Sequence, residues 1–222
     1  MARSKRITLG GIVYHVLNRA NGKLTIFRSV GEFKAFERIL AEGIQRFDMR
    51  MCGYCIMSNH WHLVLWPKLD GDLSEFMRWV TVTHTQRWHA SHGTTGTGHI
   101  YQGRFKSFPV QRDGHYLSVL RYVESNALRA GMVVSSGDWL WSSFAVRCGA
   151  EKDIRLSRGP VRLPEDWAAL VDDVDGETEH VEFERCVKRG CPFGGQAWVK
   201  VMARKLGLES TLRVRGRPRK GS

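Results

Sequence analysis

The sequence predicts an α+β fold in which helices pack on an antiparallel sheet. Strand-like and helix-like segments follow one another in the order strand, helix, strand, strand, helix, strand, helix. The two adjacent strands, 50–57 and 60–66, are separated only by the turn-forming pair Ser58 and Asn59, and so short a connection joins strands antiparallel. With 222 residues, of which 42% are hydrophobic, the chain is long enough to bury a sizeable core.

The other elements are assigned from the spacing of apolar residues. A first strand is expected at 11–18, and a helix at 30–47, where apolar side chains recur on one side. The elements after the hairpin are a helix at 72–89, a glycine- and threonine-rich loop at 91–98, a strand at 100–110, a helix at 114–130 and a shorter helix at 195–206.

The chain is strongly basic, with 34 Lys and Arg against 22 Asp and Glu and a net charge of +12. This excess favours a polyanionic partner, because neutralising phosphates with Lys and Arg supplies most of the affinity of non-specific nucleic-acid binding. An anionic membrane surface is the competing partner. No segment approaches the ~20 apolar residues of a membrane span, and the first residues lack the apolar core of a signal peptide. We therefore expect a soluble, intracellular protein with no membrane partner.

Composition along the chain predicts three parts. Residues 1–150 should form the main domain, 151–206 a partly helical C-terminal extension, and 207–222 a flexible basic tail. An acidic run at 172–184 breaks the basic trend, and we interpret it as a solvated helix or loop rather than a metal site.

The most informative feature of the main domain is the pair His60 and His62, with Trp61 between them. Alternate side chains of a strand point to the same face, so two such imidazoles can converge on one metal ion. The alternative is a pair of partly buried strand histidines that only hydrogen-bond their neighbours. The spacing by itself favours this alternative.

The five cysteines are an odd number, which argues against a disulfide framework. Cys52 and Cys55 form a Cys-x-x-Cys, which would suit a redox pair or half of a zinc site. A separation of three places their side chains on opposite faces of the expected strand, so we interpret them as core cysteines.

The helix at 114–130 carries a polar stripe beside its apolar face, and Tyr122 and Asn126 lie on this stripe. Residues four apart are neighbours on a helix, so the phenol and the amide should project side by side. An ordinary surface stripe is the alternative. Together with His60 and His62, these groups offer nitrogen and oxygen ligands that suit Mg²⁺ or Mn²⁺ better than zinc. Such an ion would polarise a scissile phosphate, and Tyr122 would be the nucleophile.

Several motifs resemble the REP-associated tyrosine transposases, the bacterial branch of the single-tyrosine HUH (His-hydrophobic-His) transposases. The similarity extends over most of the chain, and the motifs that carry it are Asn59–Val64, Gly98–Ser107, Arg121–Gly131, Trp141–Phe144, Leu208–Arg213 and Arg217–Lys220. The first three of these motifs, in this order, are far more specific than one His-x-His. One departure is Ala127, where many relatives have proline, and it should leave the chemistry unaffected.

The resemblance implies the ferredoxin-like antiparallel sheet of the HUH endonuclease fold, in agreement with the order of elements. It implies that His60 and His62 bind the metal, that Asn126 is a further ligand and that Tyr122 is the nucleophile. The implied activity is metal-dependent cleavage and strand transfer of single-stranded DNA carrying a REP-like hairpin, through a 5′-phosphotyrosine, in the bacterial cytoplasm at the nucleoid. A monomer and a homodimer are both compatible with the resemblance. The alternative is a domesticated hairpin-binding or regulatory protein without turnover.

Basic residues complete the expected DNA surface. Arg104 and Lys106 are two apart on the expected strand, so both should face one side and hold phosphates. Tyr101 and Phe105 would either stack unpaired bases or belong to the core. In the tail, Arg215–Pro218 resembles the core of an AT-hook, whose arginines enter the minor groove; a solvated tail that only adds charge is the alternative. The tail residues expected to bind DNA are Arg215, Arg217, Arg219 and Lys220.

Overall fold

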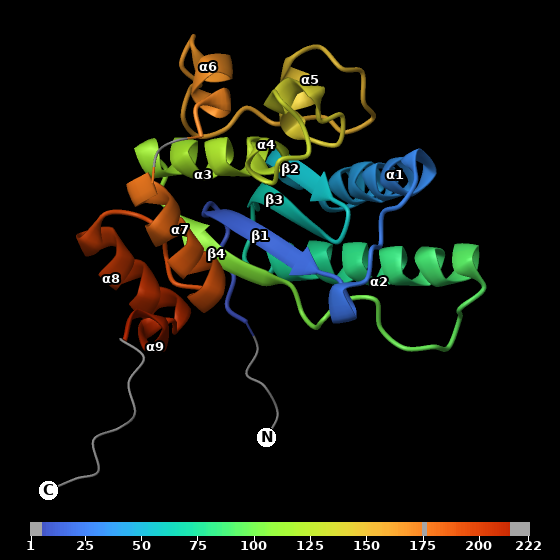
Figure 1. Cartoon of the computed structure of the whole chain (residues 1–222). Helices are drawn as coiled ribbons and strands as arrows, with labels where there is room; N and C mark the ends of the chain where they lie inside the picture. The colour runs from blue at the N-terminus through green and yellow to red at the C-terminus, as the bar shows by residue number, and fades with distance from the viewer. Residues whose placement is uncertain (1–5, 175–176, 214–222) are drawn as a thin grey trace, which may run out of the picture.

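The computed structural model describes residues 6–174 and 177–213, and a four-stranded antiparallel sheet forms its centre (Figure 1). The strand order is β2-β3-β1-β4, so β2 and β4 are the edges. The strands are β1 (Val13–Arg19), β2 (Arg50–Met57), β3 (His60–Trp66) and β4 (Lys106–Val110). The predicted α+β fold with an antiparallel sheet is confirmed.

Helices cover both faces of the sheet (Figure 1). One face packs on α1 (Val30–Phe47) and α2 (Asp72–His92), and the other on α3 (Gly114–Glu124), which α4 (Asn126–Arg129) follows at once. The remaining elements are η1 (Asn21–Lys23), η2 (Ser136–Asp138), α5 (Ser143–Arg147), α6 (Trp167–Asp172), α7 (Glu177–Arg189), α8 (Gln196–Leu206) and α9 (Glu209–Leu212).

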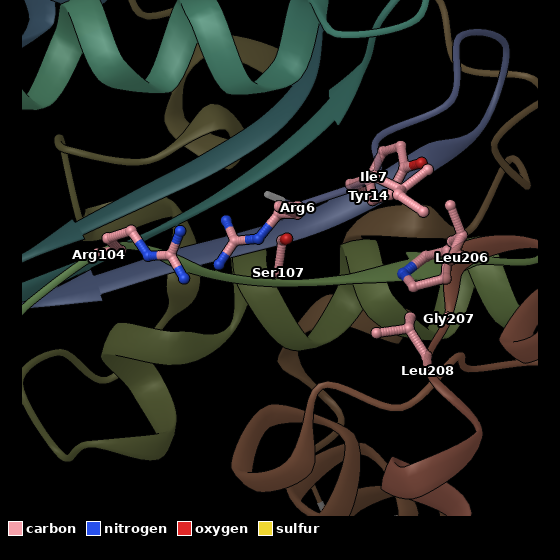
Figure 2. Close-up of a pocket in the computed structure, with 9 residues that line it drawn as sticks. Arg6, Ile7, Tyr14, Arg104, Ser107, Leu206, Gly207 and Leu208 are labelled. Atoms are coloured by element: carbon pink, nitrogen blue, oxygen red, sulfur yellow. The ribbon is translucent and has the colours of Figure 1, made fainter. Parts of the chain in front are cut away.

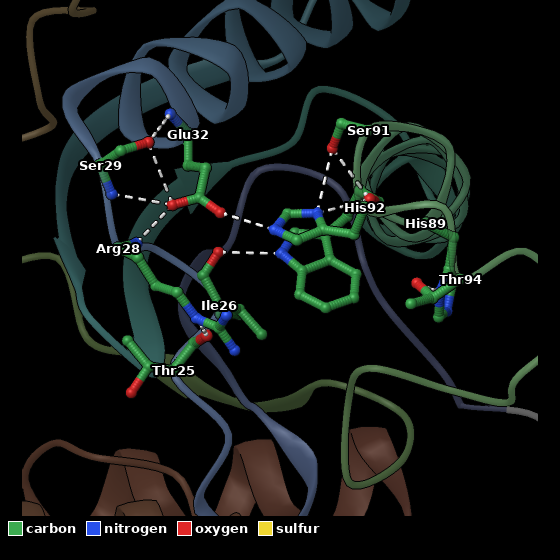
Figure 3. A network of polar contacts seen from close by, with 10 residues as sticks. Thr25, Ile26, Arg28, Ser29, Glu32, His89, Ser91, His92 and Thr94 are labelled. Carbon is green, nitrogen blue, oxygen red and sulfur yellow. Dashed lines mark hydrogen bonds and ion pairs between the residues drawn. The ribbon is translucent and has the colours of Figure 1, made fainter.

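Polar contacts fix the start of α1 to the end of α2 (Figure 3). The Ser29 hydroxyl accepts from the Glu32 N–H, and the Glu32 carboxylate accepts from the Ser29 N–H, which forms a capping box. The other Glu32 oxygen lies 3.0 Å from His92 Nε2. Trp88 Nε1 donates to the Ile26 carbonyl, and the Trp88 ring stacks on His92. The two helices therefore form one layer against the sheet.

Two expected elements differ in extent from those observed. The strand expected at 100–110 is confined to β4, because residues 102–104 form a bend. The helix expected at 114–130 is divided at Ser125, where ψ is 3°, yet the Ser125 N–H still donates to the Arg121 carbonyl at 2.9 Å. The helical register therefore continues into α4. The other expected elements are confirmed, with α2 continuing to His92.

The expectation that Cys52 and Cys55 lie on opposite faces of their strand is wrong. The register of β2 against β3 shifts between Met51 and Gly53, because a β-bulge adds Cys52 to one strand. Both cysteines are consequently buried in the core beneath α3, and both are free thiols. They are core cysteines, as interpreted, although alternation along the strand fails at this point.

The C-terminal extension packs on the main domain. α7 contacts β4 and α3, and α6 also contacts α3. The division of the chain at residues 150 and 206 stays a prediction. The tail residues Arg215, Arg217, Arg219 and Lys220 lie outside the described residues. Within the described ranges, no helix has the length and apolar character needed to cross a membrane.

Candidate active site on the α3 face of the sheet

The two histidines of β3 point to the face that α3 covers. The ring centroids of His60 and His62 lie 5.1 Å apart, as alternation along one strand requires. Trp61 points to the opposite face, where it is fully buried and packs on Phe36 of α1. Burial of this indole therefore fixes the direction of both imidazoles.

A third histidine lies beside the pair. β1 and β3 are antiparallel neighbours in which His15 is opposite Val64 and Leu17 is opposite His62, so His15 and His62 are diagonal neighbours on one face. His15 Nε2 lies 2.8 Å from His62 Nδ1. The His15 ring is fully buried against Phe108, and burial lowers its pKa to about 3. His15 is therefore neutral at ordinary pH.

Burial also keeps the two candidate ligands neutral. The pKa of His62 lies well below its ordinary value, because the ring is buried and because His15 and His60 would add positive charge beside it. Burial and the positive charge of Arg19 lower the pKa of His60 to about 4. His60 Nδ1 lies 2.7 Å from Asn59 Oδ1, a contact that orients the ring. Neutral imidazoles have the lone pair that metal coordination requires.

The polar stripe of α3 and α4 meets these histidines. The Tyr122 ring is edge-on to His62, with 5.9 Å between the ring centroids. The Asn126 side chain interacts with both His60 and Tyr122: it favours the protonated form of the imidazole and the deprotonated form of the phenol through their pKa values. One amide therefore links the helical segment to β3, and the structure brings all four side chains together.

The Tyr122 phenol is partly covered by α7. Its ring centroid is 3.8 Å from that of Phe183, and the guanidinium carbon of Arg129 is 5.8 Å from the ring centre. Burial and the negative charge of Glu184 raise the pKa of Tyr122, while Arg129 and a hydrogen bond from Asn126 oppose the rise. The phenol is therefore protonated at neutral pH, and it must lose this proton to act as a nucleophile.

Glu124, also on α3, anchors this helix to the segments that follow it. Its buried carboxylate accepts hydrogen bonds from Ser143 Oγ, Arg147 Nε and Trp167 Nε1. Removing one partner of a buried charge typically costs roughly 3–5 kcal/mol. The network fixes the rotation of α3, and with it the direction of Tyr122.

Comparison with known proteins gives a family with this arrangement of helices and strands. The family model described as "Transposase IS200 like" matches residues 8–126, more than half of the chain. The chain belongs to the IS200-like transposase family. A solved structure of a REP-associated tyrosine transposase bound to a REP hairpin has a TM-score of 0.54 and 19% sequence identity, covering 74% of this chain and 99% of that one. This likeness confirms the expected fold. Comparison with curated proteins gives no match.

The side chains of this transposase fit a divalent ion with mixed ligands. In the part of the chain that the structure describes, no three His, Cys, Asp or Glu side chains are grouped to hold a metal. The donors at the site are the imidazoles of His60 and His62 and the amide oxygen of Asn126. Two nitrogens and one oxygen, completed by water or phosphate oxygens, form a mixed ligand set for a divalent ion.

The contact between His15 and His62 also fits a metal ligand. If His62 Nδ1 donates its proton to His15 Nε2, then His62 Nε2 presents a lone pair and His15 carries its own proton on Nδ1. That His15 Nδ1 is buried and has no partner among the described residues. The tautomer in which His62 Nε2 can bind a metal thus leaves the buried Nδ1–H of His15 unsatisfied. Metal binding at His62 would offset this cost.

The expected DNA-binding residues lie on two sides of the sheet. Lys106 is opposite Leu17, which is itself opposite His62, so Lys106 faces the candidate site. Arg104 lies in the bend before β4 and lines a cavity with Ser107, whose side chain faces the other way. The expectation that Arg104 and Lys106 face one side of a strand is therefore wrong, because β4 begins only at Lys106.

Tyr101 and Phe105 are core residues. Tyr101 is buried, and its hydroxyl accepts from Trp61 Nε1 at 3.0 Å and lies 2.6 Å from His84 Nδ1. Phe105 is buried, with one side of its ring beneath the guanidinium group of Arg6. The core alternative is therefore confirmed for both aromatic residues.

Sequence reasoning missed His15, Phe183 and Glu124. A signal for His15 exists, since it is a polar residue within the mostly apolar run Val13–Leu17, but only the pairing of β1 with β3 gives it a partner. Phe183 belongs to the acidic run expected to be solvated. Phe183 and Cys186 are three apart and both buried, so α7 has an apolar side. Glu124 shows no local sign of its partners, which come from later elements.

Proposed function

We propose that this transposase is a metal-dependent single-stranded DNA endonuclease and strand transferase that acts on REP-like hairpin DNA. The proposal depends on the close approach of Tyr122 to the two histidines, with ring centroids 5.9 Å apart for Tyr122 and His62, and on Asn126, which interacts with His60 on β3 and Tyr122 on α3. A candidate nucleophile and two neutral imidazoles therefore share one small site. The solved transposase of similar fold is bound to a REP hairpin, which supports hairpin DNA as the substrate.

In the proposed reaction the Tyr122 oxygen attacks the scissile phosphorus. The bond from phosphorus to the 3′-oxygen breaks, the phenol loses its proton, and the leaving 3′-oxygen gains one. One strand end becomes a free 3′-hydroxyl, and the other is joined through its 5′-phosphate to Tyr122. His60, His62 and Asn126 would hold a divalent ion, which when bound polarises the phosphate and stabilises its developing charge.

The phosphotyrosine retains the phosphodiester bond for rejoining. A 3′-hydroxyl of the same or another strand attacks the phosphorus, and the Tyr122 oxygen leaves and regains its proton. A hydrolase would lose this bond to water. The use of a tyrosine rather than water is therefore what allows strand transfer.

Tyr122 meets His62 of its own chain, so we infer that the nucleophile acts within one subunit and that a monomer is sufficient. A mixture of Tyr122→Phe and His62→Ala proteins is then expected to remain inactive. Recovery of cleavage in the mixture would show that two subunits share the site.

Covalent capture of DNA tests the nucleophile. A 3′-labelled hairpin oligonucleotide with a single-stranded flank, incubated with the protein and Mn²⁺, should give a labelled protein band on a denaturing gel. Tyr122→Phe should abolish the band. Tyr116→Phe is the matched control, because Tyr116 lies on the same helix but is buried in the core. A band that persists in Tyr122→Phe would show that the nucleophile is another residue.

A protein that binds hairpins without cleaving them is the second candidate. The observation that favours it is the Phe183 ring, which lies 3.8 Å from the Tyr122 ring and partly covers the phenol. A gel-shift assay beside the capture assay separates the two functions. Wild-type protein that shifts the hairpin, but forms no adduct with either Mg²⁺ or Mn²⁺, would support the binding function.

A further inference from the structure

Two arginines far apart in the sequence meet beside β4, at the edge of the sheet (Figure 2). Arg6 Nη2 donates to the Phe105 carbonyl at 2.7 Å, and the guanidinium carbon lies 4.0 Å from the centre of the Phe105 ring. A guanidinium that is both stacked and hydrogen-bonded is held in one orientation. Little further side-chain entropy is therefore lost when it binds a ligand.

Arg104 directs its guanidinium toward that of Arg6 (Figure 2). Both line a cavity of about 400 Å³, together with Ser107. Burial and the positive charge of Arg104 lower the pKa of Arg6 to about 10. Across residues 6–174 and 177–213, no carboxylate forms an ion pair with either arginine. A phosphate between the two groups would relieve their repulsion and accept from their N–H donors.

The cavity lies beside the edge strand β4, between this strand and the two arginines. β4 pairs with β1 along its length, and on its other side a bridge joins Val110 to Phe193 at one end. At the opposite end Ser107 lines the cavity, while Lys106 faces the side of His62. A DNA strand that crosses this edge would meet Arg6 and Arg104 on one face of the sheet and Lys106 on the other.

Both ends of the described chain reach the same cavity. Arg6 and Ile7 line it from one end, and Leu206–Leu208 from the other. The sequence beyond each end is basic and contains no acidic residue: Arg3 and Lys5 precede Arg6, and Arg215, Arg217, Arg219 and Lys220 follow Arg213. Charge of one sign on both adjoining segments increases the attraction of a polyanion.

We propose that Arg6 and Arg104 form a clamp for a backbone phosphate of the DNA, separate from the reaction centre at Tyr122. This inference rests on the proposed function in taking DNA as the ligand. Paired guanidinium groups recognise phosphate oxygens by charge and by their forked donors, so the clamp positions the strand without reading its bases.

The salt dependence of hairpin binding tests the clamp. The affinity of the full-length protein for a fluorescent hairpin oligonucleotide is measured by anisotropy between roughly 50 and 200 mM salt. Arg104→Gln should weaken binding several-fold at low salt and reduce the slope of log K against log salt by about 0.7–0.9, the contribution of one phosphate contact. Arg104→Lys keeps the charge, and it should therefore restore the slope.

Arg155→Gln is the matched control. Arg155 is an exposed arginine whose cavity also contains Glu42 and Asp153, whereas no carboxylate is among the described residues that line the cavity of Arg6 and Arg104. This variant should leave both the slope and adduct formation unchanged. Arg6→Gln, with its fold verified by circular dichroism, should reproduce the loss seen in Arg104→Gln. The double variant should lose less than the sum of the two single losses, because both arginines bind one phosphate.

An unchanged slope in Arg104→Gln would overturn the proposal. It would also fail if inorganic phosphate bound the wild type through Arg104 while the slope for DNA did not depend on this residue, because the cavity would then hold a free anion. The proposed chemistry is judged separately, on adduct formation by the wild type. Absence of an adduct would contradict the endonuclease and still leave the slope to decide on the clamp.

Discussion

Each face of the sheet holds a buried histidine beside a tyrosine. Under α1 and α2 the ring centroids of His84 and Tyr101 are 5.7 Å apart, and under α3 those of His62 and Tyr122 are 5.9 Å apart. Each of the two histidines is only 4% exposed. Burial lowers the pKa of both imidazoles and raises the pKa of both phenols. Ring type, distance and burial therefore do not distinguish the two pairs.

Their hydrogen bonds do distinguish them. The Tyr101 hydroxyl lies between Trp61 Nε1 and His84 Nδ1, and the His84 ring packs on Phe27 and Phe36. This arrangement uses the polar atoms of the pair within the core. We interpret it as a structural cluster of the core.

Under α3 the polar atoms connect to one another across elements. Asn126 joins Tyr122 to His60, and the buried Nδ1 of His15, behind His62, has no partner among the described residues. Buried polar groups in proteins are nearly always satisfied, so an exception beside a cluster of potential ligands indicates a functional site. Shared and unsatisfied polar atoms, rather than burial, therefore separate the candidate site from the core.

Exchange of each histidine for alanine should produce opposite results on the two faces. His62→Ala should slow adduct formation by about 1000-fold, equivalent to about 4 kcal/mol, because a metal ligand is lost. His84→Ala should keep the rate per folded molecule and lower the free energy of unfolding by roughly 2–5 kcal/mol, because it leaves a cavity beside two aromatic rings. Single-turnover capture and urea unfolding measure the two effects. Equal losses of rate in the two folded variants would remove the distinction between the faces.

A smaller effect is expected at His15, which supports His62 from behind. His15→Phe keeps the ring volume and removes the hydrogen bond to His62 Nδ1. Loss of such a supporting contact typically lowers metal affinity by about 10–100-fold. Calorimetric titration with Mn²⁺ measures the affinity, and excess Mn²⁺ should restore adduct formation. An affinity equal to that of the wild type would make His15 a core residue of the same kind as His84.

The fold could be predicted where local pattern determines it. The hairpin of β2 and β3 follows from two strand-like runs around a short turn, and α1 follows from its apolar spacing. The prediction fails where a single backbone irregularity changes which face of the strand a side chain occupies. A bulge moves Cys52 to the face of Cys55, and the bend before β4 separates Arg104 from Lys106. A glycine adjoins each irregularity, Gly53 at the bulge and Gly103 in the bend, but an isolated glycine does not by itself show which side chains change face.

The candidate site could be predicted where its residues lie close together in sequence. His60 and His62 share a strand face, and Tyr122 and Asn126 lie one helical turn apart; the structure brings these pairs together, and their roles stay predictions. His15 could not be found in this way, because its contact depends on which strands pair. The clamp could not be predicted for the same reason, because Arg6 and Arg104 are far apart in the sequence and meet only in the folded protein.

Acid titration should show whether the buried pair His84 and Tyr101 excludes a proton while the protein stays folded. In the unfolded chain His84 titrates near its ordinary pKa of about 6.5, whereas burial lowers the pKa in the folded protein to about 3. Between these values the unfolded chain binds a proton that the folded protein does not. The free energy of unfolding should therefore be fully present above pH 6.5 and fall as the pH is lowered, with His84 contributing up to about 1.4 kcal/mol per pH unit.

His84→Phe should flatten this dependence by that amount in urea unfolding at pH 7, 6 and 5. His99→Gln, at an exposed position, controls for the loss of a histidine from the chain. The phenylalanine leaves the Tyr101 hydroxyl with its bond from Trp61 but without His84, so some loss of stability at pH 7 should accompany the flatter curve. If the curve of His84→Phe kept the slope of the wild type, His84 would accept a proton inside the folded core. The hydrogen bonds of Tyr101 would then not close the pair to protons, and they would no longer separate the two faces.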